Sequence, residues 1–303
     1  MSAGRQSATA FCDYLRRFER GGTLDVFMGD PEIAGKYYYG QDLKGFNFVR
    51  VRMSFRGALD AIIEHIEEDP RYRGPFQRKT IYAGSLPIGD FLPGFAGENA
   101  MHLLPASVGG RIWLGHASNV SCHYDTQDNL ACVVAGKRRF TLYAPDLIGA
   151  LYVGPIDHTM AGQPVSLAAA SAPDPGRFPL FEKIRDQALV AELEPGDALY
   201  LPKLWWHQVE ATAPFNGLIN YWWDAFSSGP DAPYTTMLLA MIAIAERPPP
   251  EREGWRAFFD HYVFRTGGHP LQHLPPDSHG PLGPLKDNYG RIRARVMQML
   301  RGS

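Results

Sequence analysis

The sequence predicts a mainly β fold with flanking helices, followed by a helical region at the C-terminus. Between residues 111 and 143, short segments alternate apolar and polar side chains, which is the period of strands buried on one face. Residues 8–19 and 55–68 instead repeat apolar side chains at helical spacing, and the composition after residue 223 again favours helices. With 303 residues and 45% hydrophobic content, the chain can bury a substantial core without disulfides.

The predicted strands fall on either side of an insert rich in glycine, alanine and proline, residues 155–181. Long irregular segments in compact domains usually carry function, so we expect this insert to form a loop over the mouth of a pocket. The strands expected before the insert cover residues 23–28, 46–53, 111–117, 120–125, 129–135 and 137–143.

The second group of strands begins after a glycine-containing turn at residues 196–197. The apolar run 198–201 follows and ends at Pro202, which cannot continue a hydrogen-bonded ladder. The next strand is expected to direct His207 into a barrel. Residues 216–223 are predicted to return as the hairpin partner of that strand, across a proline-containing turn.

Helices are expected in the C-terminal region over residues 231–245, 251–264 and 286–301. The apolar face at residues 237–242 could form a homodimer or pack on the barrel, and the sequence leaves both open. Three histidines in a proline-rich loop are irregularly spaced, which favours solvated side chains over a second metal site. These are His269, His273 and His279.

Composition narrows the class of function and the compartment. A net charge of -2 gives no positive electrostatic potential to attract a phosphate backbone, so no nucleic-acid partner is expected. Three cysteines, Cys12, Cys122 and Cys132, are too few for a disulfide framework and favour a reducing compartment. No signal-peptide pattern and no membrane-length apolar run are found, so we expect a cytoplasmic protein without a membrane partner.

The most informative pattern is a His-x-Asp motif, His123 and Asp125, followed far downstream by His207. Side chains alternate along a strand, so positions 123 and 125 project to one face and can bind one ion while Tyr124 points away. Two imidazoles and one carboxylate form the facial triad of Fe(II) oxygenases, which leaves the other metal positions open. Zinc would more often take a closed tetrahedral set or a cysteine.

Several ordered stretches carry a resemblance to a known family. Over residues 79–224 the chain resembles the JmjC-type and cupin-like 2-oxoglutarate oxygenases, notably the branch that contains the asparaginyl hydroxylase of the hypoxia response. The wider sequence is similar to bacterial cupin-like proteins. The matching stretches are residues 81–85, 123–129, 136–145, 195–197, 205–207 and 220–222.

The resemblance implies a double-stranded β-helix, or jelly-roll, core in a domain of residues 1–229, with a helical region over 230–303. Relatives usually begin with an extra strand, so the amino terminus is expected to be truncated. The implied cofactors are Fe(II), 2-oxoglutarate as cosubstrate and O2. The implied iron ligands are His123, Asp125 and His207, and the positions implied to contact 2-oxoglutarate are Tyr82, Asn129, Arg138 and Asn220.

Arg138 stands where many relatives have a lysine that pairs with the distal carboxylate of 2-oxoglutarate. A guanidinium is always charged and can bind a carboxylate through two parallel hydrogen bonds, so the exchange is chemically compatible. Strand alternation places Arg138 on the inward face with Phe140 and Leu142, whereas Lys137 faces outward. The bulkier side chain could shift the cosubstrate or favour another keto acid.

The resemblance therefore predicts a dioxygenase that hydroxylates an unactivated carbon of a protein or peptide side chain. Two alternatives stay open: the same chemistry on a small molecule such as an amino acid or secondary metabolite, and a non-catalytic metal-binding cupin. Demethylation of N-methyl lysine would use the same oxidant. Five tryptophans near the motifs could line the pocket, although core packing is favoured for such large side chains. They are Trp113, Trp205, Trp206, Trp222 and Trp223.

Overall fold

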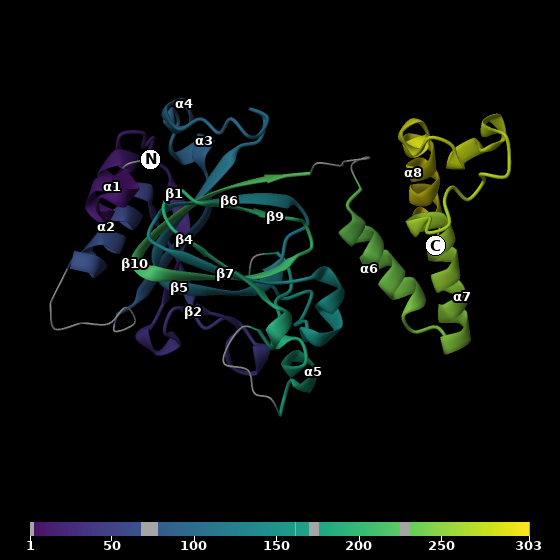
Figure 1. The fold of residues 1–303 in the computed structure, drawn as a ribbon, viewed down its shortest axis with the longest axis horizontal. Coiled ribbons are helices and arrows are strands. Elements are labelled where there is room, and N and C mark those ends of the chain that lie inside the picture. Colours follow the sequence, from purple (N-terminus) through teal and green to yellow (C-terminus); the bar gives the residue numbers. More distant parts are fainter. Residues whose placement is uncertain (1–2, 68–77, 161, 170–175, 225–230, 303) are drawn as a thin grey trace. The chain divides into compact units, whose positions relative to one another are not determined.

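A computed structural model describes residues 3–67, 78–160, 162–169, 176–224 and 231–302 (Figure 1). The chain divides into two compact units, Met1–Asp224 and Ala225–Ser303. In the described residues, the strands belong to the first unit and the second unit is helical. The mainly β fold class with flanking helices is confirmed.

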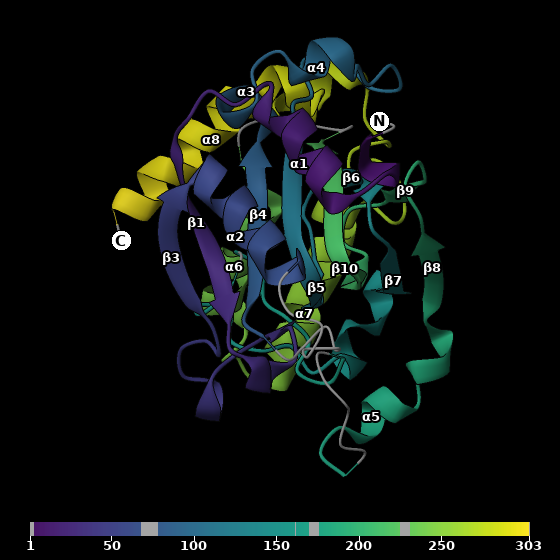
Figure 2. The ribbon, with the colours of Figure 1, turned by 90° about the vertical axis from the view of Figure 1, so that its left-hand side faces the viewer.

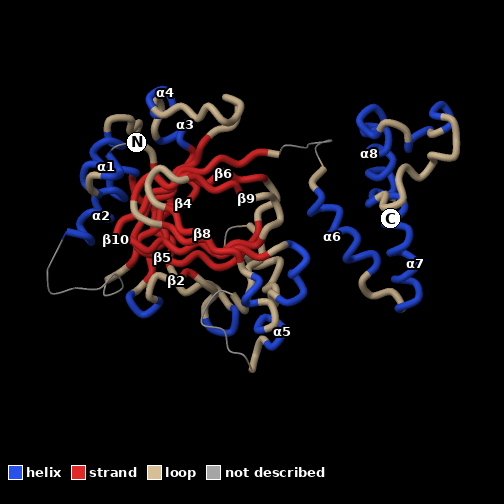
Figure 3. The backbone as a smooth tube through the Cα atoms, in the orientation of Figure 1, coloured by secondary structure: helices blue, strands red, loops and turns tan. Residues whose placement is uncertain are grey.

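Two long strands organise the first unit, β5 (Gly110–Tyr124) and β10 (Trp206–Trp223), which pair antiparallel along most of their length. Register shifts bend this pair, so the two halves of β10 have different neighbours on the other side. The first half pairs with β7 (Arg138–Tyr143) and the second half with β6 (Asp128–Ala135). β5 and β10 thus form the centre of a single sheet with two branches, and Figure 3 shows its strands curving around a common interior.

The remaining strands extend both branches of this sheet. They are β1 (Thr23–Gly29), β2 (Lys36–Tyr37), β3 (Val49–Ser54), β4 (Thr80–Pro87), β8 (Leu189–Leu193) and β9 (Ala198–Leu201). The main branch has the strand order β3-β1-β4-β5-β10-β6-β9. The second branch adds β2 to β5, and adds β7 and then β8 to β10. This arrangement is consistent with the jelly-roll core that the resemblance implies.

Helices α1 (Ala8–Arg16) and α2 (Phe55–Glu67) lie against the face of the sheet that contains β1, β4 and β5 (Figures 1 and 2). Their apolar faces bury Phe11, Leu59 and Ile62 in one core cluster with side chains of these strands. Shorter helices cover the strand ends. These are α3 (Ile88–Phe91), α4 (Phe95–Glu98), α5 (Pro179–Glu182) and the 3-10 turns Ala3–Arg5, Pro31–Ile33, Gln41–Leu43, Pro145–Ala150 and Arg185–Gln187.

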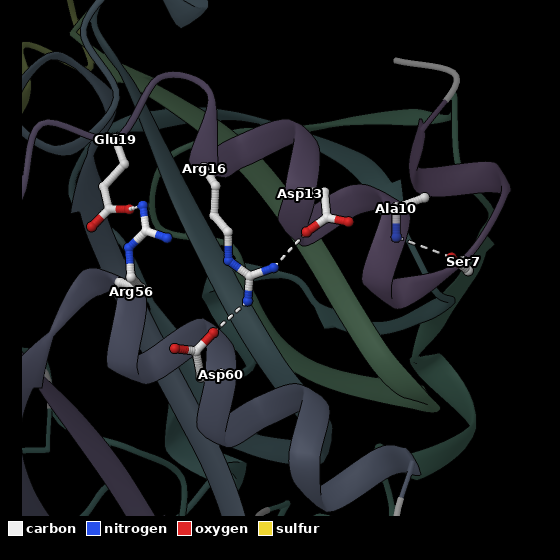
Figure 4. Close-up of polar contacts among 7 residues, drawn as sticks. All are labelled: Ser7, Ala10, Asp13, Arg16, Glu19, Arg56 and Asp60. Atoms are coloured by element: carbon white, nitrogen blue, oxygen red, sulfur yellow. Dashed lines mark hydrogen bonds and ion pairs between the residues drawn. The ribbon is translucent and has the colours of Figure 1, made fainter.

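Polar contacts fix the ends of α1 and join it to α2 (Figure 4). The Ser7 hydroxyl caps α1 by accepting a hydrogen bond from the Ala10 N–H at 3.0 Å. Arg16 binds Asp13 on its own helix at 2.6 Å and also pairs with Asp60 on α2. These contacts orient both helices, whereas burial of their apolar faces supplies most of the stabilisation.

A buried histidine connects α2 to the sheet through two hydrogen bonds. His116 on β5 accepts a hydrogen bond at Nδ1 from the Ile81 N–H of β4, at 3.0 Å. Because Nδ1 accepts, Nε2 carries the hydrogen and donates to the Ile62 carbonyl of α2, also at 3.0 Å. This imidazole is therefore a structural group that satisfies two buried backbone groups.

Two local predictions are wrong. The strands expected at 111–117 and 120–125 form the single strand β5. The hairpin expected between 207–211 and 216–223 does not exist, because both segments belong to β10 and both pair with β5. Pro214 lies at the register shift between Ala211 and Phe215, where a missing N–H is tolerated and a turn is not required.

The second unit contains α6 (Pro233–Ile244), α7 (Pro249–Phe259), a π-helical turn (Asp260–Phe264) and α8 (Leu285–Arg301), with 3-10 turns at Pro276–Ser278 and Gly280–Leu282. These helices match the three predicted segments closely. The homodimer remains a prediction. Within the described ranges, no helix combines the length and the apolar character needed to cross a membrane.

Two of the three loop histidines of this unit, His269 and His279, are hydrogen-bonded to the local backbone. A ring nitrogen of His269 lies 2.8 Å from the Leu282 carbonyl, and one of His279 lies 3.1 Å from the Leu274 carbonyl. The two rings also stack, with centroids 4.5 Å apart. In the described part of the chain, these histidines do not belong to a cluster of metal-ligating side chains.

We expect His116→Leu to lower the free energy of unfolding by about 2 kcal/mol, because it leaves the buried Ile81 N–H without its partner and removes the hydrogen bond to the Ile62 carbonyl. Urea denaturation of the metal-free protein would measure this loss. The matched control is His102→Leu at an exposed position, which should change stability by no more than about 0.5 kcal/mol. Equal stability of the two variants would contradict the structural role of His116.

Candidate metal centre

The structure brings the three predicted ligands together. His123 near the end of β5 lies directly opposite His207 near the start of β10, and their ring centroids are 4.4 Å apart. Asp125 follows β5, and its Oδ2 atom lies 3.7 Å from Nε2 of His207. One ligand atom from each residue lies within 4.8 Å of the others. Among the described residues, no other set of three His, Cys, Asp or Glu side chains converges in this way.

Hydrogen bonds to backbone carbonyls fix the tautomer of both histidines. Nδ1 of His123 lies 2.8 Å from the Ser121 carbonyl, and Nδ1 of His207 lies 3.0 Å from the Trp205 carbonyl. A carbonyl can only accept, so each Nδ1 carries the hydrogen and each Nε2 keeps its lone pair for a metal. Burial, with a contribution from His123, lowers the pKa of His207 to about 4, so this ring is neutral at physiological pH.

A bulge in β5 shapes the strand just before His123. Between the pairs His207↔His123 and Val209↔Val120, β5 contains one residue more than β10. Both Val120 and Ser121 therefore line the pocket next to the triad. The Ser121 hydroxyl is buried and donates to the Tyr37 carbonyl of β2 at 2.9 Å, so its hydrogen is already used within the protein.

All seven residues predicted for the site line a single pocket. They are Tyr82, His123, Asp125, Asn129, Arg138, His207 and Asn220. Apolar side chains form much of the remaining wall. These include Phe27, Tyr37, Phe48, Trp113, Met160 and Val165. The polar groups thus sit in an apolar surround, which strengthens their interactions with a bound ligand.

Arg138 is the buried cation of this pocket. Its side chain is only 3% exposed, and its Nε atom has no hydrogen-bond partner within the described residues. The neighbouring Lys137 is directed outward and forms an ion pair with Glu194 at 2.6 Å, as strand alternation predicts. Burial raises the pKa of Tyr82 to about 12, although Arg138 opposes the rise, so the Tyr82 hydroxyl keeps its proton and can donate.

A chain of hydrogen bonds orients the two amides. The indole N–H of Trp113 donates to Oδ1 of Asn220 at 2.7 Å. The amide nitrogen of Asn220 then donates to Oδ1 of Asn129 at 3.1 Å. Each amide oxygen therefore has a partner inside the protein, and the amide nitrogen of Asn129 is the donor end of the chain. The arrangement offers a directed hydrogen-bond donor to a ligand.

The insert runs alongside the ligand strand. Val165 bridges to His123, and the Ser166 N–H donates to the Cys122 carbonyl at 2.7 Å. Met160, Gln163 and Val165 line the pocket, as expected for a loop that borders it. Oε1 of Gln163 is buried and lacks a hydrogen-bond partner in the described residues, so it can accept from a ligand. Residues 161 and 170–175 of the insert lie outside the described residues.

Two pocket residues were interpreted from sequence as packing groups. Trp113 and Trp222 both line the pocket and make polar contacts there, whereas Trp206 is fully buried against Tyr124. Alternation along β10 could have identified Trp222, because it lies two residues after Asn220 and shares its face. Gln163 carried no comparable signal in the sequence, since its segment has no regular period.

The residues present fit a divalent metal ion and a keto-acid dianion. Two imidazoles and a carboxylate that converge in the pocket are a facial donor set. A buried guanidinium with an unpaired Nε matches a carboxylate, and the Tyr82 hydroxyl can supply a further donor.

We expect the protein to bind one Fe(II) or Co(II) per chain, and His123→Ala to abolish this binding because it removes one of three ligands. Metal at about 100 times its Kd should raise the free energy of unfolding by about 2.7 kcal/mol. Anaerobic calorimetric titration and thermal unfolding measure both effects. His269→Ala, in the second unit, should leave the binding unchanged. If His123→Ala bound metal as tightly as the wild type, the site would lie elsewhere.

Comparisons with known proteins agree with this geometry. The family model described as a cupin-like domain matches residues 1–229. The chain is 39% identical over 121 residues to a Jumonji C domain-containing protein 5 of Drosophila melanogaster. The match covers 40% of this chain and 29% of that protein. It is also 30% identical over 178 residues to an HSPB1-associated protein 1 of Bos taurus. That match covers 57% of this chain and 34% of the other protein.

A third relative is a tRNA wybutosine-synthesizing protein 5 of Mus musculus, 35% identical over 106 residues, which are 35% of this chain and 30% of that protein. The chain thus spans about a third of the length of each of these relatives. The family match covers most of the chain and includes every residue of the candidate site. This protein therefore belongs to the JmjC-like family of cupin-like domains.

Proposed function

We propose that this protein is an Fe(II)- and 2-oxoglutarate-dependent hydroxylase that oxidises an unactivated carbon of a protein or peptide side chain. The observation that carries the proposal is the buried, incompletely paired Arg138 in the same pocket as the His123, Asp125 and His207 triad. A buried charge is costly unless a group of opposite charge binds to it. The free carboxylate of a metal-bound keto acid is such a group.

The side chains have distinct tasks in this proposal. Nε2 of His123, Nε2 of His207 and the Asp125 carboxylate would hold Fe(II). Arg138 and Tyr82 would bind the far carboxylate of 2-oxoglutarate. Bound Fe(II), with 2-oxoglutarate and O2, supplies an oxidant that can hydroxylate a C–H bond. The protein then has to position the substrate and exclude water, which the apolar walls favour.

A non-catalytic metal-binding cupin explains less of the pocket. The triad alone would suffice to hold a metal ion. Such a protein would have no use for a cation that is 3% exposed with an unpaired Nε beside the metal ligands. Retaining this cation costs stability, which supports a role in binding a second, anionic ligand.

The charges of the pocket favour a side chain of a larger molecule over a free amino acid. Apart from the two histidines, Arg138 and Asp125 are the charged groups among the described lining residues, and both have roles in binding cofactors in this proposal. The carboxylate or phosphate of a small metabolite would find no further cation in the described wall. An uncharged side chain presented by a peptide fits the apolar wall better.

We expect the protein to convert 2-oxoglutarate to succinate in the presence of Fe(II), O2 and cell extract as the source of substrate. Arg138→Met should raise the KM for 2-oxoglutarate by about 30-fold or more, because losing one partner of a buried charge pair costs about 2 kcal/mol or more. Succinate detected by mass spectrometry measures the reaction.

Arg139→Met is the matched control, because Arg139 is the next residue on β7 and is exposed on the other face. It should keep the wild-type KM. Succinate formation that survives in Asp125→Ala, or equal KM values for Arg138→Met and Arg139→Met, would refute the proposed use of the pocket.

The substrate class can be tested by treating a cell extract with wild-type protein and with Asp125→Ala. We expect a gain of one oxygen atom on an uncharged side chain of a protein, found only with the wild type, since only an intact triad can hold the iron. Peptide mass spectrometry would locate it. A new oxygen found on a small metabolite, and on no protein, would favour the alternative substrate class.

A further inference from the structure

We propose that Trp222 is a positioning residue of the metal centre, whose indole N–H holds the Asp125 carboxylate in the orientation that binds the metal ion. The inference rests on the proposed function, because it requires that the triad bind a metal. Trp222 lies near the end of β10, and its Nε1 donates a hydrogen bond to Oδ2 of Asp125 at 3.0 Å. It acts through Asp125 and needs no contact with substrate.

Asp125 needs such a partner more than the two histidines do. Both imidazoles belong to paired strands, and each is held by a hydrogen bond from Nδ1 to a carbonyl. Asp125 lies one residue beyond the end of β5, where its backbone carbonyl accepts a hydrogen bond from the Leu204 N–H at 2.8 Å. In the described part of the protein, the donor that reaches its carboxylate is the indole of Trp222.

The indole is itself held in place from two sides. Trp113 meets it edge to face, with ring centroids 5.8 Å apart and an interplanar angle of 87°. The guanidinium of Arg111 lies 5.9 Å from the Trp222 ring centre, and Arg111 is fixed by two hydrogen bonds of 2.7 Å to Ser85, one to Oγ and one to the carbonyl. A rigid donor of this kind fixes a carboxylate better than a mobile side chain would.

Trp222 also links the metal ligand to the cosubstrate contacts. The Trp113 ring that packs on Trp222 donates its own N–H to Asn220, which is bonded to Asn129. A single connected group of side chains therefore supports both the carboxylate ligand and the two amides. Loss of the Trp222 N–H removes one end of this group without removing the aromatic packing, provided that the replacement is phenylalanine.

The next residue offers a matched control. Trp223 points to the opposite face of β10, where it stacks on Tyr200 with ring centroids 6.0 Å apart. Trp222→Phe and Trp223→Phe are therefore the same chemical change at adjacent positions of one strand. Only the first removes a hydrogen bond to a metal ligand.

The test is a titration of the metal-free, full-length protein with Co(II), followed by calorimetry and by the visible absorption of the bound ion. We expect Trp222→Phe to raise the Kd for Co(II) by about 10- to 100-fold, the usual effect of losing a hydrogen-bond partner of a ligand. Its metal-free unfolding midpoint should equal that of Trp223→Phe, and Trp223→Phe should keep the wild-type Kd and absorption spectrum.

Two results would overturn the inference. One is a Trp222→Phe protein that binds Co(II) as tightly as Trp223→Phe. The other is a Trp222→Phe protein whose metal-free unfolding midpoint falls below that of Trp223→Phe together with its affinity, because the effect would then be structural. Failure of the proposed function has a different signature: His123→Ala would also bind Co(II) like the wild type.

Discussion

The antiparallel pairing of β5 with β10 is the interaction on which the site depends. This pairing sets His123 directly across from His207, although the two residues lie 84 positions apart in the sequence. A shift of one residue in this register would turn one imidazole to the opposite face and destroy the site. The same two strands lie at the centre of the branched sheet and contribute side chains to two core clusters, which help to hold the register.

Irregularities in these strands shape the pocket as much as the regular pairing does. The extra residue in β5 directs Val120, Ser121 and His123 to one region of the pocket wall. The shift around Pro214 lets β10 pass from its pairing with β7 to its pairing with β6, so that His207 and Asn220 line the same pocket from the two halves of one strand. Bulges of this kind are common next to binding sites because they re-aim side chains.

Most polar groups of the pocket have their partners within the protein, and the exceptions identify where a ligand belongs. Backbone carbonyls hold the two imidazoles, indole N–H groups hold the Asp125 carboxylate and the Asn220 amide, and Asn220 orients Asn129. Among the described residues that line the pocket, Nε of Arg138 and Oε1 of Gln163 are buried without a hydrogen bond. A buried polar atom without a partner is unfavourable in the free protein, so both atoms are candidates for contact with ligands.

Local patterns in the sequence were sufficient to predict the five longer helices, most strands and the inward direction of Arg138, because alternation and helical spacing depend only on neighbouring residues. The short helices α3, α4 and α5 were not predicted. The joining of residues 206–223 into one strand was not predictable in this way, since a proline between two strand segments is equally compatible with a turn and with a bulge. The partner of Asp125, the position of Gln163 and the unpaired state of Arg138 depend on contacts between segments far apart in the chain. Only the tertiary structure decides such contacts, because strand register and the bending of the sheet determine which distant side chains share the interior.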